Sequence, residues 1–198
     1  MTSEKICKVS FAAAGIALWF AAVPAASARP VPPAARAAAP QSAPAATTNP
    51  NEGFLATWKD ISGKLIVMAE DFPEDKYDYK PKPEVRSFAE QLIHATGSVY
   101  YFKAMIEGRQ PKESDEAKRS DFKSKAEIVA YAKKAVAEGT AMIEKADFSK
   151  TIKGSRRQIN PYQFWSDFCE HPGEHYGQMV VYYRVNGLVP PDSRPPAK

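Results

Sequence analysis

Histidine is rare in this chain, and two of its three copies lie four residues apart. His171 and His175 fall within the segment EHPGEHYGQMVVYYRVNGLVPP, and His94 is the third. Two histidines at positions i and i+4 of a helix point the same way and can chelate one metal ion through neutral imidazole nitrogens. A third imidazole from a facing helix would complete one face of a coordination sphere. The remaining positions would stay open, which is typical of a catalytic rather than a structural metal site.

The spacing alone does not decide between a metal site and ordinary histidines. A His-x-x-x-His pair also arises on the solvated face of a helix, with His94 then a hydrogen-bonded core residue. Pro172 and Gly173 separate the pair, and proline inside a helix removes the hydrogen bond to the carbonyl of Phe168. We therefore expect the helix to be kinked or to restart near His171. Such a kink either shapes the site or is tolerated without a role.

Several polar residues near the pair could assist it. Cys169 could supply a thiolate, although a buried, inert thiol is the simpler interpretation. Glu170 and Glu174 could act as a general base or orient a ligand, or they could simply be solvated. Tyr176 and Gln178 could donate hydrogen bonds to a bound ligand. None of these residues is assigned a catalytic role from the sequence.

The N-terminal part of the chain differs in composition from the rest. Residues 1–28 carry two early lysines, an apolar run and small residues up to Ala28, which is the pattern of a secretory signal peptide. Residues 29–51 are rich in proline and alanine and predict a disordered, extended linker. The expected protein is periplasmic or secreted, cleaved after Ala28 and not attached to a membrane. An uncleaved anchor is the alternative, but the apolar run is short for one.

Charge and cysteine content narrow the classes of partner. The 27 basic and 23 acidic residues give a net charge of +4, and no basic stripe with interleaved aromatic residues accompanies it, so nucleic-acid binding is not expected. After signal cleavage Cys169 is the remaining cysteine, which excludes a disulfide framework and leaves packing or a metal to hold the domain together. The expected partner is a small-molecule substrate, and the sequence leaves room for a homodimer.

Residues 52–198 predict four amphipathic helices, and no segment favours a strand. Apolar residues recur at three- and four-residue intervals in each helix, and the ends carry capping signals. The first helix is expected to start near Phe54 and to end near Asp71, and the second to start at Ser87-x-x-Glu90 and to end at Gly108. The third is expected to start at Ser124-x-x-Glu127. The fourth is expected to start at Asn160-Pro161 and to end at Asn186-Gly187.

The second and third helices are joined by a long polar connection. Roughly 16 extended residues from Gly108 to Lys123 reach about 50 Å, whereas a helix of about 20 residues spans about 30 Å. The connection can therefore return along the whole bundle, and the two helices it joins can run parallel. The fold class that follows is all-α, a four-helix bundle.

Two blocks of the sequence resemble the DinB-like superfamily of DinB/YfiT-type four-helix-bundle metalloenzymes. EHYGQMVVYYRVNGLVPPDSR is similar to its C-terminal signature, and SFAEQLIHATGSVYYF is similar to its histidine-bearing second helix. The resemblance extends from about Phe54 to Arg194 and implies up-down-down-up helix order. It also implies a divalent metal, zinc or nickel, held by His94, His171 and His175.

The resemblance implies less about the reaction. Some members of the family are thiol S-transferases in which the metal activates the thiolate, so we expect a metal-dependent transferase or a hydrolase. Export counts against the transferase, because low-molecular-weight thiols are chiefly cytosolic reagents. The alternative is a non-catalytic bundle that binds a metal or a small ligand in an envelope stress setting. Family membership by itself does not establish an activity.

Overall fold

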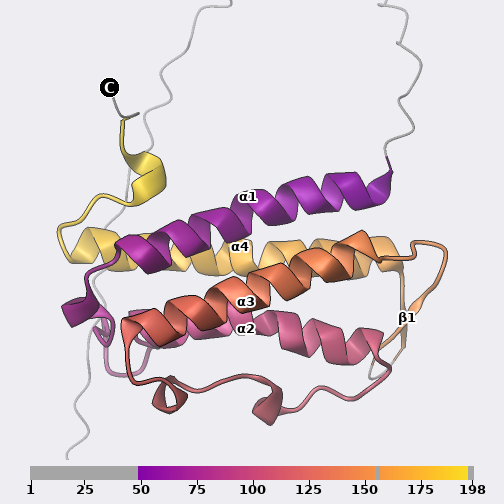
Figure 1. Cartoon of the computed structure of the whole chain (residues 1–198), viewed down its shortest axis with the longest axis horizontal. Coiled ribbons are helices and arrows are strands. Elements are labelled where there is room, and N and C mark those ends of the chain that lie inside the picture. The colour runs from indigo at the N-terminus through magenta and orange to yellow at the C-terminus, as the bar shows by residue number, and fades with distance from the viewer. Residues whose placement is uncertain (1–48, 155–156, 196–198) are drawn as a thin grey trace, which may run out of the picture. The chain divides into compact units, whose positions relative to one another are not determined.

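The computed structural model describes residues 49–154 and 157–195, which form a four-helix bundle (Figure 1). The helices are α1 (Pro50–Asp71), α2 (Phe88–Ile106), α3 (Lys125–Glu144) and α4 (Pro161–Val185). Figure 1 shows α1 and α4 running in one direction and α2 and α3 in the other. The predicted up-down-down-up order is therefore confirmed. The predicted signal peptide and nearly all of the predicted linker lie outside the described residues.

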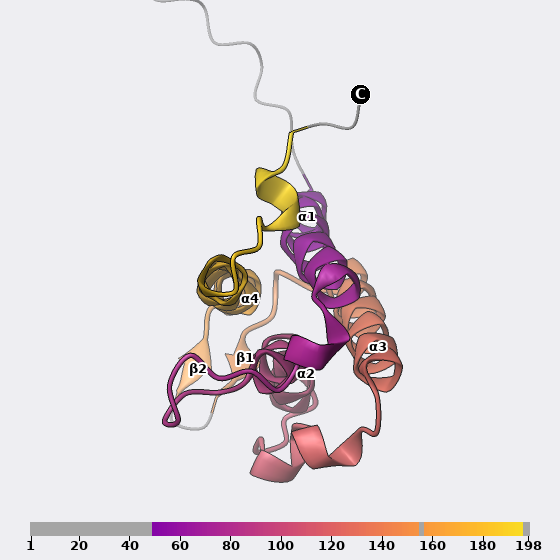
Figure 2. The ribbon, with the colours of Figure 1, turned by 90° about the vertical axis from the view of Figure 1, so that its left-hand side faces the viewer.

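The long connection after α2 explains this helix order. It carries two short 3-10 turns, η2 (Glu113–Asp115) and η3 (Arg119–Asp121), and returns along the bundle to the start of α3 (Figure 1). In the end-on view of Figure 2, α2 lies beside α3 and α4, whereas α1 lies diagonally opposite α2. Helices α2 and α4, which carry the three histidines, are therefore direct neighbours.

The helix ends follow the capping signals of the sequence. Ser87 accepts a hydrogen bond from the Glu90 amide, and the Glu90 carboxylate accepts one from the Ser87 amide, which completes a capping box. Gly108 and Gly187 follow α2 and α4 with φ of 69° and 71°, a left-handed conformation that glycine adopts without strain.

The first helix begins earlier than expected. The Asn49 side chain accepts a hydrogen bond from the Asn51 amide and Pro50 occupies the first helical turn. This is the same asparagine–proline start that opens α4 at Asn160, so the last two residues of the predicted linker, Pro50 and Asn51, are helical.

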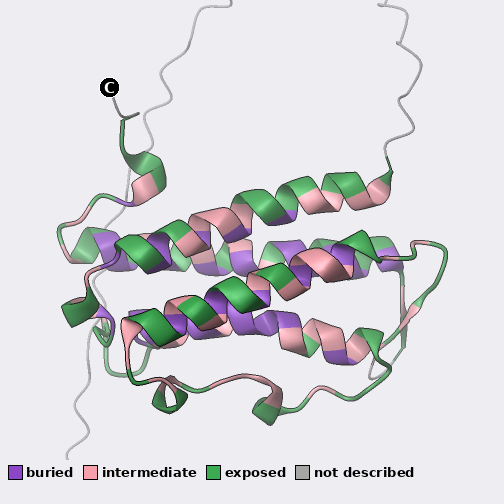
Figure 3. Ribbon diagram, in the orientation of Figure 1, coloured by how far each residue is buried: buried purple, intermediate pink, exposed green. Residues whose placement is uncertain are grey.

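Figure 3 shows buried residues on all four helices. The apolar ones form two clusters. The first contains Leu65, Met68, Phe72, Tyr77, Phe88, Leu92, Ile93, Ile128, Met179 and Tyr183. The second contains Trp58, Val99, Ile143, Phe164, Trp165, Phe168 and Cys169. On α2, His94 falls between Ile93 and Val99; on α4, His171 and His175 fall between Cys169 and Met179. The histidines thus occupy the stretch where one cluster gives way to the other.

The structure contradicts one expectation about local structure and excludes one of the two alternatives given for the fourth helix. A short antiparallel pair joins β1 (Ile152–Lys153) to β2 (Gln158–Ile159) between α3 and α4, where no strand was expected. Two-residue strands are too short to leave an alternating pattern in the sequence.

The fourth helix does not restart at Pro172. It is continuous from Pro161 to Val185 with Pro172 inside it. Phe168 before the proline and Met179 after it are both buried in the core. Packing on both sides therefore holds the helix through the missing hydrogen bond, because tertiary contacts outweigh local propensity. None of the helices among the described residues combines the length and the apolar character needed to cross a membrane.

Candidate metal centre

The structure brings the three histidines together between α2 and α4. Each offers one ring nitrogen, and these nitrogens lie within 4.8 Å of one another. The ring centroids are 5.2 Å apart for His94 and His171, 4.7 Å for His94 and His175, and 4.5 Å for His171 and His175. Pro172 therefore does not turn His171 away from His175. Three imidazoles so arranged can share one divalent ion.

His171 provides the sharpest sign of a ligand site. Its Nε2 is buried and has no hydrogen-bond partner among the described residues. Burial, followed by the nearby rings of His175 and His94, lowers the pKa of His171 to about 4. The ring is therefore neutral at pH 7 and keeps a lone pair available. Because a buried polar nitrogen without a partner is costly, a metal ion at this nitrogen fits the site.

His94 is oriented by a carboxylate from the connection between α2 and α3. Its Nδ1 lies 2.9 Å from both Oε1 and Oε2 of Glu116. An Nδ1–H that donates to this carboxylate leaves Nε2 as the basic nitrogen. The hydrogen bond to His94 also lowers the pKa of Glu116, which therefore stays ionised. A carboxylate behind a ligating imidazole fixes its tautomer and strengthens it as a ligand.

His175 is oriented by two glutamines. Gln91 Nε2 lies 2.6 Å from His175 Nδ1 and donates a hydrogen bond to Gln178 Oε1 at 2.5 Å. Gln91 and His175 are both buried, and burial is the main cause that lowers the pKa of His175. In this orientation Gln91 donates to Nδ1, and the proton of the neutral ring lies on Nε2. Turning both glutamine amides by about 180° would place the Gln91 oxygen against an Nδ1–H and leave Nε2 for a ligand.

The other polar residues near the pair do not join the site. Cys169 is buried, its thiol points to the Phe54 carbonyl at 3.8 Å, and burial raises its pKa to about 11. The simpler interpretation of Cys169, an inert buried thiol, therefore fits. Glu170 and Glu174 are exposed on α4, and Tyr176 makes a 3.5 Å contact with Asp192 at the far edge of the helix.

Three residues around the site were missed in the sequence: Gln91, Glu116 and Arg86. Gln91 precedes His94 by three residues and therefore shares its helix face, so a glutamine within an apolar stripe was a usable signal. Glu116 lies in a polar connection rich in acidic residues, and nothing local distinguishes it from its neighbours. Arg86 is the last residue before the N-cap of α2, and only the tertiary fold brings it near the histidines.

Comparisons with known proteins agree with this architecture. A DinB-like protein of Bacillus cereus ATCC 10987 has a similar crystal structure, with a TM-score of 0.60 and 18% identity over 71% of this chain and 95% of that one. A DinB-like protein of Bacillus subtilis gives a TM-score of 0.58 and 19% identity over 69% of this chain and 94% of that one. At these identities the likeness establishes the fold alone.

The family assignment rests on the sequence. A search of the curated proteins found no match. The family model of the DinB superfamily matches residues 62–179, which is more than half of the chain and includes all three histidines. The chain therefore belongs to the DinB superfamily.

Proposed function

We propose that this protein binds a divalent metal ion through His94, His171 and His175 and acts as a metal-dependent transferase or hydrolase on a small molecule. The observation that carries the proposal is the convergence of three ring nitrogens, one from each histidine, within 4.8 Å. The buried Nε2 of His171, which has no partner among the described residues, supports it. Imidazole ligands suit zinc and nickel, and three protein ligands leave coordination positions for water or substrate.

The residues around the histidines have defined tasks in this proposal. Glu116 holds the His94 proton on Nδ1, so that Nε2 faces the ion. Gln91 holds the His175 proton on Nδ1 when its amide oxygen accepts a hydrogen bond from the Nδ1–H. In that orientation the amide nitrogen of Gln178 donates to the same Gln91 oxygen. A bound divalent ion supplies Lewis acidity, which polarises a carbonyl group or lowers the pKa of a bound water or thiol.

Export remains part of the proposal and bears on the reaction. The signal-peptide pattern of residues 1–28 supports a periplasmic or secreted protein. Export favours a hydrolase over a thiol S-transferase, because low-molecular-weight thiols are chiefly cytosolic.

The first test is the metal content of untagged protein, measured by elemental analysis. We expect close to one divalent ion per chain in the wild type and little in His175→Ala. Chelator should lower the melting temperature of the wild type, and zinc or nickel should restore it. Metal at about 100 times its Kd adds about 2.7 kcal/mol to the free energy of unfolding. A melting temperature that ignores both chelator and metal would contradict the proposal.

A further inference from the structure

Two clefts lie beside the metal centre, on either side of the segment that leads into α2 (residues 80–86). The first, of about 550 Å³, is bounded by this segment, α2 and the connection that carries Glu116. The second, of about 840 Å³, lies between the same segment and α4 and is lined by Gln91 and Gln178. The residues that orient His94 and His175 therefore each line one cleft. The histidines themselves line neither cleft, so each cleft meets the centre through a residue that contacts a histidine.

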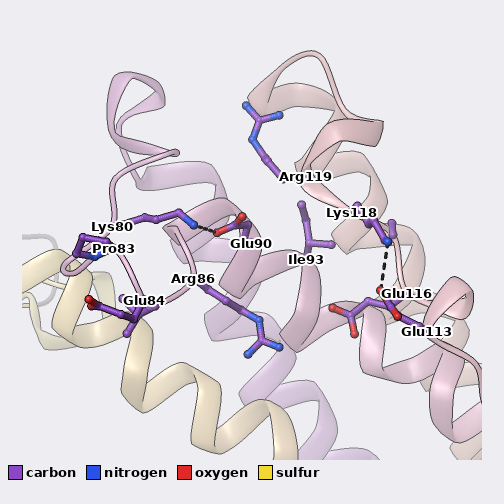
Figure 4. A pocket seen from close by; sticks show the side chains of 12 residues that line it. Lys80, Pro83, Glu84, Arg86, Glu90, Ile93, Glu113, Glu116, Lys118 and Arg119 are labelled. Atoms are coloured by element: carbon purple, nitrogen blue, oxygen red, sulfur yellow. Dashed lines mark hydrogen bonds and ion pairs between the residues drawn. The ribbon is translucent and has the colours of Figure 1, made fainter.

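Arg86 lines both clefts. Its backbone is fixed, because the Tyr182 hydroxyl donates a 2.5 Å hydrogen bond to the Arg86 carbonyl and the next residue, Ser87, caps α2. In Figure 4 the Arg86 guanidinium extends away from Glu84 and toward the side of the cleft on which Glu116 lies. Its positive charge also contributes to lowering the pKa of His171, His175 and Glu116, which places the guanidinium within electrostatic range of the centre.

Arg86 differs from the other cations of the first cleft in having no ionic partner. No described carboxylate lies within ion-pair distance of its guanidinium. The remaining three cations are engaged, in the pairs Lys80–Glu90 at 2.9 Å, Lys118–Glu113 at 3.2 Å and Arg119–Asp78 at 2.6 Å. A guanidinium in a cleft without a carboxylate partner is suited to bind an anion from solution through its planar fork of donors.

We propose that Arg86 binds a carboxylate group of the small molecule on which the metal centre acts, and that the substrate is therefore an organic acid. The inference rests on the proposed metal site. A carboxylate fits better than a doubly charged phosphate. In the first cleft, where Glu116 lies, Arg86 is the one described cation without an ion-pair partner, and Glu84 and Glu116 would repel a second negative charge there.

The test compares two thiols that offer the metal the same sulfur ligand but differ in charge at the other end. The probes are 3-mercaptopropionate and the neutral 3-mercaptopropanol, titrated against cobalt-loaded protein and followed by the cobalt–thiolate absorption. We expect the wild type to bind the carboxylate probe about fivefold more tightly, as for a partly exposed ion pair. Arg86→Gln should abolish this preference, and Arg86→Lys should retain part of it.

Two controls isolate the role of Arg86. Lys118→Gln removes the same charge from the same cleft and should leave most of the preference, because Lys118 is already paired with Glu113. All variants are measured at one pH of about 8, well above the ordinary pKa of an imidazole. The preference of the wild type should also shrink as salt is added.

The outcomes separate the two proposals. Protein that binds cobalt and both thiols with no preference, or with a preference unchanged in Arg86→Gln, would overturn the role of Arg86 and leave the metal site standing. A preference lost equally in Lys118→Gln would also overturn it, because general cleft charge would then be the cause. Protein that binds no cobalt would contradict the metal site, and the inference with it.

Discussion

The two helix pairs of this bundle have similar amphipathic sequences but different interiors. Between α1 and α3, the Trp58 ring lies against Gly139, and its indole nitrogen donates to the Val136 carbonyl and to Thr140 at 3.3 and 3.2 Å. That interface is packed tightly and its polar group is satisfied. Between α2 and α4, three imidazoles and two glutamine amides meet, and the Nε2 of His171 has no partner in the described part of the chain.

The difference separates stability from function. Apolar packing and satisfied hydrogen bonds stabilise a fold. A buried and incompletely satisfied polar cluster does not, and such clusters are characteristic of functional sites. Changes between α1 and α3 should therefore alter the free energy of unfolding without changing metal affinity. Changes to the polar residues between α2 and α4 should lower metal affinity, and should alter the free energy of unfolding mainly through the loss of bound metal.

The largest effect is expected for the histidines themselves. Each single alanine substitution at His94, His171 or His175 should reduce metal affinity by more than about 100-fold, because it removes a direct ligand rather than an orienting residue. A second substitution should add little, because residues that share one ion are coupled. Calorimetric titration of the three single and three double variants measures this. Small, additive losses would show that the histidines do not share an ion.

A glycine in the other interface provides the converse experiment. A Cβ on Gly139 would lie 2.5 Å from Trp58 Cζ2 and 3.1 Å from Phe168 Cζ. Gly139→Ala should therefore destabilise the protein by about 1–2 kcal/mol, because overpacking outweighs the gain in helix propensity of about 1 kcal/mol. Denaturant unfolding of the metal-free protein measures the change, and metal affinity should stay the same.

Gly63→Ala is the matched control for Gly139→Ala. It makes the same chemical change within α1, but a Cβ there meets nothing within 4 Å. It should raise the free energy of unfolding by up to about 1 kcal/mol. Equal effects at Gly63 and Gly139 would show that the close contact with Trp58 is not the reason why residue 139 is glycine.

A smaller effect is expected for the residue that orients His94. Glu116→Gln keeps an oxygen that can accept the Nδ1–H bond but removes the charge, and should weaken metal binding about tenfold. Glu113→Gln, in the same connection, alters an exposed carboxylate that pairs with Lys118 and should change affinity little. Metal titrations of both variants make the comparison, and equal affinities would show that Glu116 does not support the ligand.

The smallest expected effect is on the pH dependence of the metal-free protein. The pKa of His171 falls from 6.5 to about 4 on folding, through burial and the nearby rings of His175 and His94. The charge of Arg86 also lowers this pKa, and the charge of Glu116 raises it. Between these values the unfolded chain binds more protons than the folded one. Stability should therefore fall as pH falls through this window, by about 1 kcal/mol for one partly exposed ring.

His171→Gln separates this contribution from that of the carboxylates. In the presence of chelator, the variant should lose less stability than the wild type between pH 7 and 5, as measured by urea unfolding. The carboxylates whose pKa is lowered, such as Glu116, act at lower pH. Parallel curves for the two proteins would show that His171 is not held neutral by its surroundings.

Much of the fold could be predicted because its signals are local. Ser87 with Glu90, Asn160 with Pro161, and the glycines at 108 and 187 each act within one helical turn. The start of α1 at Pro50 was missed although Asn49–Pro50 carries the same signal, because the surrounding proline-rich composition favoured a linker. The β1–β2 pair was missed because it is too short to show a pattern.

The sequence by itself determined the four helices, the length of the crossover and the identity of the three histidines, because periodicity, caps and residue type act over short distances. Only the tertiary structure decided that α4 runs unbroken through Pro172, since packing of Phe168 and Met179 outweighs one lost hydrogen bond. Only the tertiary structure brought Glu116 behind His94, 22 residues along the chain, and placed Arg86 between two clefts. Such positions depend on where the crossover and the segment before α2 lie against the bundle, and no local propensity records that.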